Sequence, residues 1–231
     1  METLDSPHRQ GKERLYPSLA NPNWLVLRQR REIFKNWISM VGGDRLHVLD
    51  VGGRIQPYRK LLGARVDRYV AIDIKVTPLV DVIARGEKLP IASGIFDLVI
   101  CTQVLEYIPD PALLTAEIYR VLKPGGSLLL SAPAMGVQDA EEDWWRFSPG
   151  SLRRLLSAFQ EVQITPEGRS ISGFVRTINS GLNVLARYEF LRSVFGWTVF
   201  PALNLTGAAL ERISRSENTQ LTTNYSAWAK K

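Results

Sequence analysis

A short apolar segment that ends in an acid and two glycines constrains the fold of this chain more than any other feature. The segment reads His47-Val48-Leu49-Asp50-Val51-Gly52-Gly53, and it predicts a buried strand over 46–51 that enters a tight turn. Because glycine has no side chain, such a turn lets the backbone come close to a ligand. The segment therefore predicts a binding turn at Asp50, Gly52 and Gly53, directly after a core strand.

A second apolar segment, residues 69–73, ends in another acid, Asp73, which lies 21 residues after Gly52. In doubly wound α/β folds, an acid at the end of the second strand can bond a ribose hydroxyl. The glycine spacing differs from the Gly-x-Gly-x-x-Gly pattern of dinucleotide-binding turns, so the turn alone does not define the ligand. Together the two segments predict a site for an adenosine-containing cofactor.

The remaining chain alternates predicted strands with predicted helices. We expect strands over 46–51, 69–73, 79–83, 96–101, 127–131, 161–165 and 224–229, and helices over 24–41, 57–62, 112–122 and 149–158. The alternation predicts an α/β fold, a doubly wound and mostly parallel sheet with helices on both faces. Residues 1–20 are polar and carry Pro7 and Pro17, and we expect them to form a flexible tail.

Four further motifs follow in order: Leu89-Pro90, Phe96-Asp97, Leu105-Glu106 and Leu122-Lys123-Pro124-Gly125-Gly126. In this order and spacing, residues 45–160 resemble the class I S-adenosylmethionine (SAM) dependent methyltransferases, in particular bacterial enzymes that act on small molecules or saccharides. The resemblance implies a Rossmann-like seven-stranded sheet whose last strand, expected at 224–229, runs antiparallel. It also implies an enzyme that transfers a methyl group from S-adenosyl-L-methionine.

By this resemblance, Asp50, Gly52 and Gly53 contact the amino-acid portion of SAM, and Asp73 bonds its ribose. Gly86 and Glu87 lie beside the adenine, and Thr102 and Gln103 lie beneath the methyl group. No metal site is expected, because methyl transfer from a sulfonium needs positioning and exclusion of water. Three positions depart from the family: Arg54 and Gln56 replace further glycines, and Arg85 replaces an acid. These departures leave a second hypothesis open, a non-catalytic SAM- or adenosine-binding or scaffold relative.

The acceptor side of the site is predicted from two segments. Glu106 follows the fourth expected strand and faces the predicted cleft, as a general base or as a structural acid. The segment Asp143-Trp144-Trp145-Arg146-Phe147-Ser148-Pro149 is similar to one found in bacterial methyltransferases encoded among cell-surface polysaccharide enzymes. We therefore expect catalytic roles for Glu106 and Asp143, and acceptor contacts from Trp144, Trp145 and Arg146. The alternative is that these rings pack the loop while Arg146 pairs with an acid.

Charge and cysteine content limit the partners and the compartment. The net charge of +6 attracts nucleic acid or an anionic membrane. However, the chain shows no concentrated basic stripe and no Asn/Asp-Pro-Pro-Tyr motif, so nucleic acid is not an expected partner. The single cysteine, Cys101, excludes a disulfide framework, and the first residues lack the pattern of a secretory signal. We expect a cytoplasmic protein.

The last third of the chain departs from a minimal domain. Within one methyltransferase domain over 21–231, with its core at 45–165, we expect a helical insertion over 173–215 before the final strand. Residues 194–210 carry no charge and are flanked by arginines at positions 187, 192, 212 and 215. The segment has the length of a membrane span but contains Gly196, Pro201 and Asn204. We favour a helical lid over the acceptor cleft, with peripheral contact of 193–210 with the inner face of a membrane as the alternative.

Overall fold

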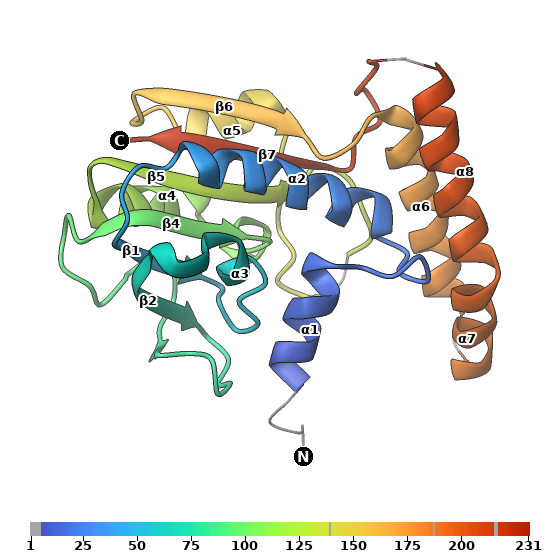
Figure 1. The fold of residues 1–231 in the computed structure, drawn as a ribbon, viewed down its shortest axis with the longest axis horizontal. Coiled ribbons are helices and arrows are strands. Elements are labelled where there is room, and N and C mark those ends of the chain that lie inside the picture. Colours follow the sequence, from blue (N-terminus) through green and yellow to red (C-terminus); the bar gives the residue numbers. More distant parts are fainter. Residues whose placement is uncertain (1–5, 139, 187, 215–216) are drawn as a thin grey trace.

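The computed structural model describes residues 6–138, 140–186, 188–214 and 217–231. Seven strands form one sheet in the order β3-β2-β1-β4-β5-β7-β6 (Figure 1). The strands are β1 (Leu46–Val51), β2 (Val66–Asp73), β3 (Val82–Ile83), β4 (Phe96–Thr102), β5 (Leu122–Pro133), β6 (Glu161–Pro166) and β7 (Asn224–Lys230). Only β7 runs antiparallel to its neighbours β5 and β6. The predicted mostly parallel, seven-stranded sheet with an antiparallel last strand is confirmed.

Helices cover both faces of the sheet, as the alternating pattern predicts. The helices are α1 (Ser6–Leu15), α2 (Trp24–Met40), α3 (Arg59–Leu62), α4 (Pro111–Val121), α5 (Pro149–Leu155), α6 (Ser170–Leu185), α7 (Glu189–Trp197) and α8 (Val199–Ser214), with short 3-10 turns η1 (Gly63–Arg65) and η2 (Leu105–Tyr107). On one face, Phe34 and Ile38 of α2 belong to the same apolar core as Ile100 of β4. On the other, Leu114 of α4 and Leu152 of α5 belong to a second apolar core.

Local chemistry sets the start of α4 as expected. The Asp110 side chain accepts a hydrogen bond from the Ala112 amide at 3.0 Å, and Pro111 occupies the first turn. Proline suits this position because its missing N–H would have no partner inside the helix. The cap fixes where the chain leaves the loop that follows β4, which carries Glu106.

The N-terminal segment differs from the expected flexible tail, because residues 6–15 form α1. Leu15 is fully buried, and α1 lies so close to the turn after β1 that a Cβ on Gly11 would come within 2.1 Å of the Ile55 carbonyl oxygen. The polar composition of this segment gave no sign of the docking, because Pro7, Gly11 and Leu15 are the buried residues of α1. Pro7 lies in the first turn of α1, where proline does not oppose a helix. Residues 1–5 lie outside the described part of the chain.

The expected insertion before the final strand forms three helices, α6, α7 and α8. Figure 1 shows them as a layer beyond the end of the sheet toward which β6 points. Because β6 runs parallel to the central strands, this end of the sheet holds their carboxyl ends, where ligands bind in open α/β folds. The helical insertion therefore lies beside the predicted site. Arg187 and Arg215, two of the expected flanking arginines, fall outside the described residues.

Candidate cofactor and acceptor site

The turn after β1 has the geometry that the two glycines predict. Gly52 has φ +79°, and a Cβ there would lie 2.3 Å from Cγ2 of Val104. A Cβ on Gly53 would meet the carbonyl oxygen of Asp50 at 2.8 Å. Both amides donate to the Ile72 carbonyl, at 2.8 and 3.1 Å, which holds the turn against β2. Larger residues would fill this space, so the turn forms a cradle between β1, β2 and the loop after β4.

Asp50 is buried at the base of this cradle. Its Oδ2 accepts a 2.6 Å hydrogen bond from the Tyr69 hydroxyl. Burial raises the pKa of Asp50 to about 7, while the bond from Tyr69 opposes the rise. Arg14 of α1 lies close enough to lower the pKa of the same carboxyl. The acid predicted from sequence is therefore present at the turn, and part of its bonding capacity is already used by Tyr69.

Asp73 lies at the end of β2, as predicted, and it remains partly exposed. Its Oδ1 accepts a hydrogen bond from the Lys75 amide at 2.8 Å, so the side chain also stabilises the turn after the strand. Among the described residues, none donates to the other carboxylate oxygen. One oxygen of Asp73 is thus engaged in the turn, and one can bind a ligand hydroxyl.

The expected adenine loop brings Gly86 and Glu87 to the edge of α4. Gly86 is buried, and a Cβ on it would lie 2.8 Å from Leu114. Arg85, which replaces the acid of the family pattern, is exposed and pairs with Oε1 of Glu87 at 3.3 Å. Oε2 of Glu87 is buried and has no partner in the described part of the chain. Glu87 therefore supplies a buried acceptor next to the position where the family's acid is missing.

Thr102 and Gln103 end β4 at the same edge of the sheet. Gln103 has φ +55°, a backbone conformation that costs free energy for any residue except glycine. Its amide donates to the Ser131 carbonyl at 2.9 Å, and its side chain bonds the Ser131 hydroxyl at 3.3 Å. The bonds to β5 hold the strained residue at the floor of the cradle.

Glu106, in η2, is 3% exposed, and its Oε2 has no hydrogen-bond partner among the described residues. Burial raises the pKa of Glu106 to about 7, against the influence of Arg30 and Arg14. Buried polar atoms in folded proteins are nearly always bonded. An unpartnered carboxylate oxygen at the carboxyl end of β4 therefore marks a position where a ligand group belongs.

The aromatic segment after β5 reaches the same place. The Trp144 amide donates to the Glu106 carbonyl at 2.8 Å, and Trp145 Nε1 donates to the Ile108 carbonyl at 2.9 Å. Trp144 is 58% exposed. Arg146 binds Asp143 through both guanidinium nitrogens. The backbone of Trp144 is thus held at Glu106 while most of its side chain stays exposed. Asp143 is engaged by Arg146, which makes it a weaker candidate for a base than Glu106.

Sequence reasoning missed a set of buried polar residues around this site. Arg14 of α1 leaves a buried Nε without a partner among the described residues. Arg30 of α2, 2% exposed, forms a 2.8 Å ion pair with fully buried Glu167. The sequence placed Arg30 among the polar residues between the apolar positions of α2. Only its long-range partner, 137 residues away, reveals it as buried.

Comparison with known proteins agrees with this geometry. Residues 49–130 match a family model described as a methyltransferase domain. The chain is 32% identical over 89 residues to a ubiquinone biosynthesis O-methyltransferase of Xanthomonas oryzae pv. oryzae, over 38% of this chain and 34% of that protein. It therefore spans about a third of the length of that curated relative.

Solved structures extend the comparison to most of the chain. A SAM-dependent methyltransferase from Archaeoglobus fulgidus aligns with 87% of this chain and 94% of its own, at 17% identity and a TM-score of 0.51. A 1,6-didemethyltoxoflavin-N1-methyltransferase from Burkholderia thailandensis, with its acceptor and S-adenosylhomocysteine bound, aligns over 88% and 78%, at 16% identity and a TM-score of 0.51. This chain therefore has the fold of the class I, SAM-dependent methyltransferases. The predicted fold is confirmed.

The residues at this site fit SAM, the predicted cofactor. SAM carries an ammonium, a carboxylate, two ribose hydroxyls and an adenine amine. The structure offers a cradle that a Cβ would fill at Gly52, a free carboxylate oxygen at Asp73 and a buried acceptor at Glu87. Arg14 adds a cation with an unpartnered buried Nε. The departures at Arg54 and Arg85 do not close the cradle, because both side chains are exposed.

Proposed function

We propose that this protein transfers the methyl group of SAM to a hydroxyl of a small-molecule acceptor. The observation that supports this most is the unpartnered, buried oxygen of Glu106 at the carboxyl end of β4, beside the glycine turn. A base whose pKa lies near 7 is useful when the acceptor is a hydroxyl, because it removes the hydroxyl proton as the bond to the methyl group forms. The curated relative is itself named as an O-methyltransferase.

In this proposal, different residues of the chain bind different parts of SAM. Gly52 and Gly53 pass close to its amino-acid portion, where Asp50 accepts from the ammonium and Arg14 binds the carboxylate. Asp73 bonds the ribose, and Glu87 accepts from the adenine amine. The sulfonium supplies an activated methyl group. Thr102 and Gln103 close the floor beneath it and exclude water, which raises the effective concentration of the acceptor.

The acceptor lies, in this proposal, between Glu106 and the exposed ring of Trp144. An aromatic face with an adjacent carboxylate suits a planar phenolic ring or the apolar face of a sugar. Trp145 holds this loop against the loop after β4, because its Nε1 donates to the Ile108 carbonyl, and the Asp143–Arg146 pair is bonded within the loop. A saccharide acceptor in cell-surface glycan biosynthesis and a cytoplasmic location remain predictions from the sequence. Formation of S-adenosylhomocysteine with a panel of phenols and glycosides tests the acceptor class.

Asp73→Asn is expected to weaken SAM binding by about 1–3 kcal/mol, the range for a lost charge-assisted hydrogen bond. The asparagine keeps an oxygen that can bond the Lys75 amide, so the turn should persist. Isothermal titration calorimetry with SAM and S-adenosylhomocysteine measures the change. Asp67→Asn, in the same strand but bonded to Arg45, is the matched control and should leave the affinity unchanged. Equal affinities of Asp73→Asn and the wild type would exclude the ribose contact.

SAM binding by the wild type, Arg85→Gln and Glu87→Gln tests whether the departure at Arg85 has weakened the cofactor site. Because Arg85 pairs with Glu87, we expect its removal to free Oε1 and to change SAM affinity by no more than about 1 kcal/mol, as for an exposed ion pair. Glu87→Gln should weaken SAM binding more, since it also removes the charge of the buried acceptor. If wild-type protein shows no heat of SAM binding at millimolar concentration, the non-catalytic hypothesis replaces the proposed function.

A further inference from the structure

Helix α7 exposes an apolar stripe at the far edge of the insertion. None of its residues is buried, and Phe190, Val194 and Trp197 share one face because they are spaced i, i+4 and i+7. Phe190 is 74% exposed and Trp197 is 86% exposed. The described segment Glu189–Ser214 is long and apolar enough to cross a membrane by length and composition alone, yet only 17% of its most apolar window is buried. Its apolar character is therefore not explained by packing inside the domain.

Helix α8 is fixed to the domain along one face, so it cannot cross a membrane while the domain stays folded. Fully buried Asn204 donates to the carbonyls of Leu19 and Asn21 at 2.8 and 3.0 Å. A Cβ on Gly207 would lie 2.9 Å from Val175 of α6. The chain also turns at Thr198 between α7 and α8. The geometry allows this segment to lie on a membrane surface and not to span it.

Along the exposed face of α8, apolar residues are followed by a basic residue toward the C-terminal end of the helix. Leu205, Ala209 and Arg212 follow one another at i, i+4 and i+7, so they line the same side of the helix. Leu205 is 53% exposed. This side of α8 therefore carries apolar residues followed by a cation at the end of the helix. This order matches an interfacial segment, in which apolar groups enter the acyl boundary and basic groups stay at the headgroups.

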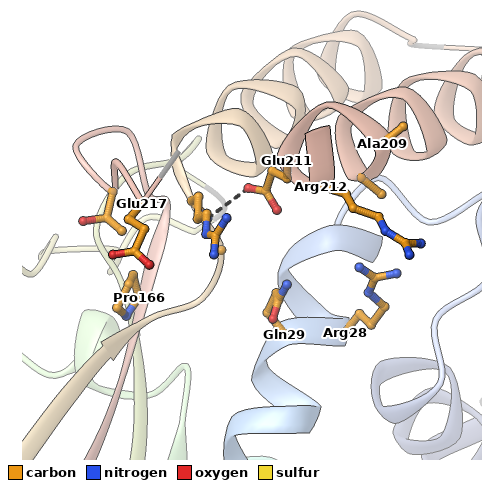
Figure 2. A pocket seen from close by; sticks show the side chains of 11 residues that line it. Arg28, Gln29, Pro166, Ala209, Glu211, Arg212 and Glu217 are labelled. Atoms are coloured by element: carbon orange, nitrogen blue, oxygen red, sulfur yellow. Dashed lines mark hydrogen bonds between the residues drawn. The ribbon is translucent and has the colours of Figure 1, made fainter. Parts of the chain in front are cut away.

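Arg212 borders a cavity of about 720 Å³ between α2, α8 and the chain after β6. Figure 2 shows the guanidinium groups of Arg212 and Arg28, both of which line this cavity, pointing toward one another. Arg28 stacks on the Trp24 ring at 4.5 Å, and neither arginine has a carboxylate partner among the described residues. Glu211, which also lines the cavity, already accepts from the amides of Arg169 and Ser172 at the start of α6.

Two converging guanidinium groups without a counter-ion suit a phosphate, which accepts hydrogen bonds from arginine in a bidentate manner. We propose that the outer surface of α7 and α8 docks this protein on an anionic phospholipid membrane. Phe190 and Trp197 enter the boundary between headgroups and acyl chains, and Arg28 and Arg212 bind lipid phosphate.

Charge favours a membrane over a second copy of the chain as the occupant of this surface. In a two-fold symmetric dimer, the same patch of each copy faces its equivalent, so the uncompensated arginines of both copies would be brought together. An anionic bilayer neutralises them instead. The net charge of +6 acts in the same direction. Exposed tryptophan and phenylalanine are also residues that anchor interfacial helices.

Vesicle flotation with the full chain tests the proposal. We expect the protein to float with vesicles of phosphatidylcholine and phosphatidylglycerol, not with phosphatidylcholine alone, and to be released partly by high salt. Arg28→Gln with Arg212→Gln should lower the partition coefficient by about 25-fold, about fivefold for each arginine. Phe190→Ser with Trp197→Ser should abolish flotation. Arg153→Gln in α5 and Leu113→Ser in α4 are exposed controls and should float like the wild type.

Two results would overturn the proposal. One is wild-type protein that stays at the bottom of the gradient with both kinds of vesicle. The other is a dimer, detected by light scattering, that becomes a monomer in Phe190→Ser with Trp197→Ser, which would assign the surface to a second copy. Thermal unfolding of each variant distinguishes lost docking from lost folding, because every substituted side chain is at least partly exposed. None of these substitutions touches the proposed cofactor residues.

Discussion

Glu167→Leu is expected to lower the free energy of unfolding by about 3–5 kcal/mol, the cost of leaving a buried charge without its partner. Oε2 of Glu167 accepts from Arg30 at 2.8 Å, and Oε1 accepts from the hydroxyls of Ser131 and Ser226 at 2.6 Å each. Burial opposes the charge of Arg30, but Glu167 outweighs burial and raises the pKa of the guanidinium. One carboxylate thus ties α2 to β5 and β7.

Urea denaturation monitored by circular dichroism measures this loss. Glu161→Gln, in exposed β6 and paired only loosely with Lys230 at 3.7 Å, is the control and should change stability by less than about 1 kcal/mol. Arg30→Met combined with Glu167→Leu should recover much of the lost stability, because it removes the uncompensated charge. A Glu167→Leu protein as stable as the control variant would mean that water reaches Arg30 and replaces its partner.

The parts of the fold that could be predicted depend on contacts close in sequence. Two examples are the apolar segment 46–51, which is followed by Gly52, and the start of α4 at Asp110-Pro111. In each case the residues that determine the structure lie within a few positions of one another. The largest difference between an expected and an observed strand boundary is at β5, which was expected to begin at 127. It begins at Leu122, because this residue pairs with Phe96 of β4. Such pairing across the sheet leaves no local trace in the sequence.

The unpredicted parts of the site depend on distant contacts. Arg14 lies in a polar segment that was expected to be flexible, and only the packing of Gly11 on Ile55 brings it to the cradle. Arg30 looks like a solvated helix residue until Glu167 is seen beside it. Whether a polar residue is buried depends on partners that are distant in the sequence. From composition alone, such a residue is expected at the surface. Apolar periodicity, by contrast, reports burial directly.

Glu106→Gln is expected to reduce turnover by about 10²–10⁴-fold with little change in SAM affinity, because a base acts mainly in the transition state. This expectation rests on the proposed hydroxyl acceptor, and turnover is measured as S-adenosylhomocysteine formed with the best acceptor from the panel. Glu142→Gln, exposed on the neighbouring loop, is the control and should retain activity. Loss of SAM binding in Glu106→Gln would instead make this residue part of the cofactor site.

The pH dependence gives an independent test of the same carboxyl. Burial raises the pKa of Glu106 to about 7, from 4.5 for an ordinary glutamate. A base is active when deprotonated, so turnover should rise through about pH 7 and then level off. The folded protein prefers the protonated form, and its stabilising contribution is complete below about pH 4.5 and is lost as pH rises through about 7. The wild type should therefore lose stability relative to Glu106→Gln over this interval, whereas Asp50 titrates equally in both proteins. A stability difference that stays constant from pH 5 to 8 would place Glu106 in contact with solvent and remove it as the base.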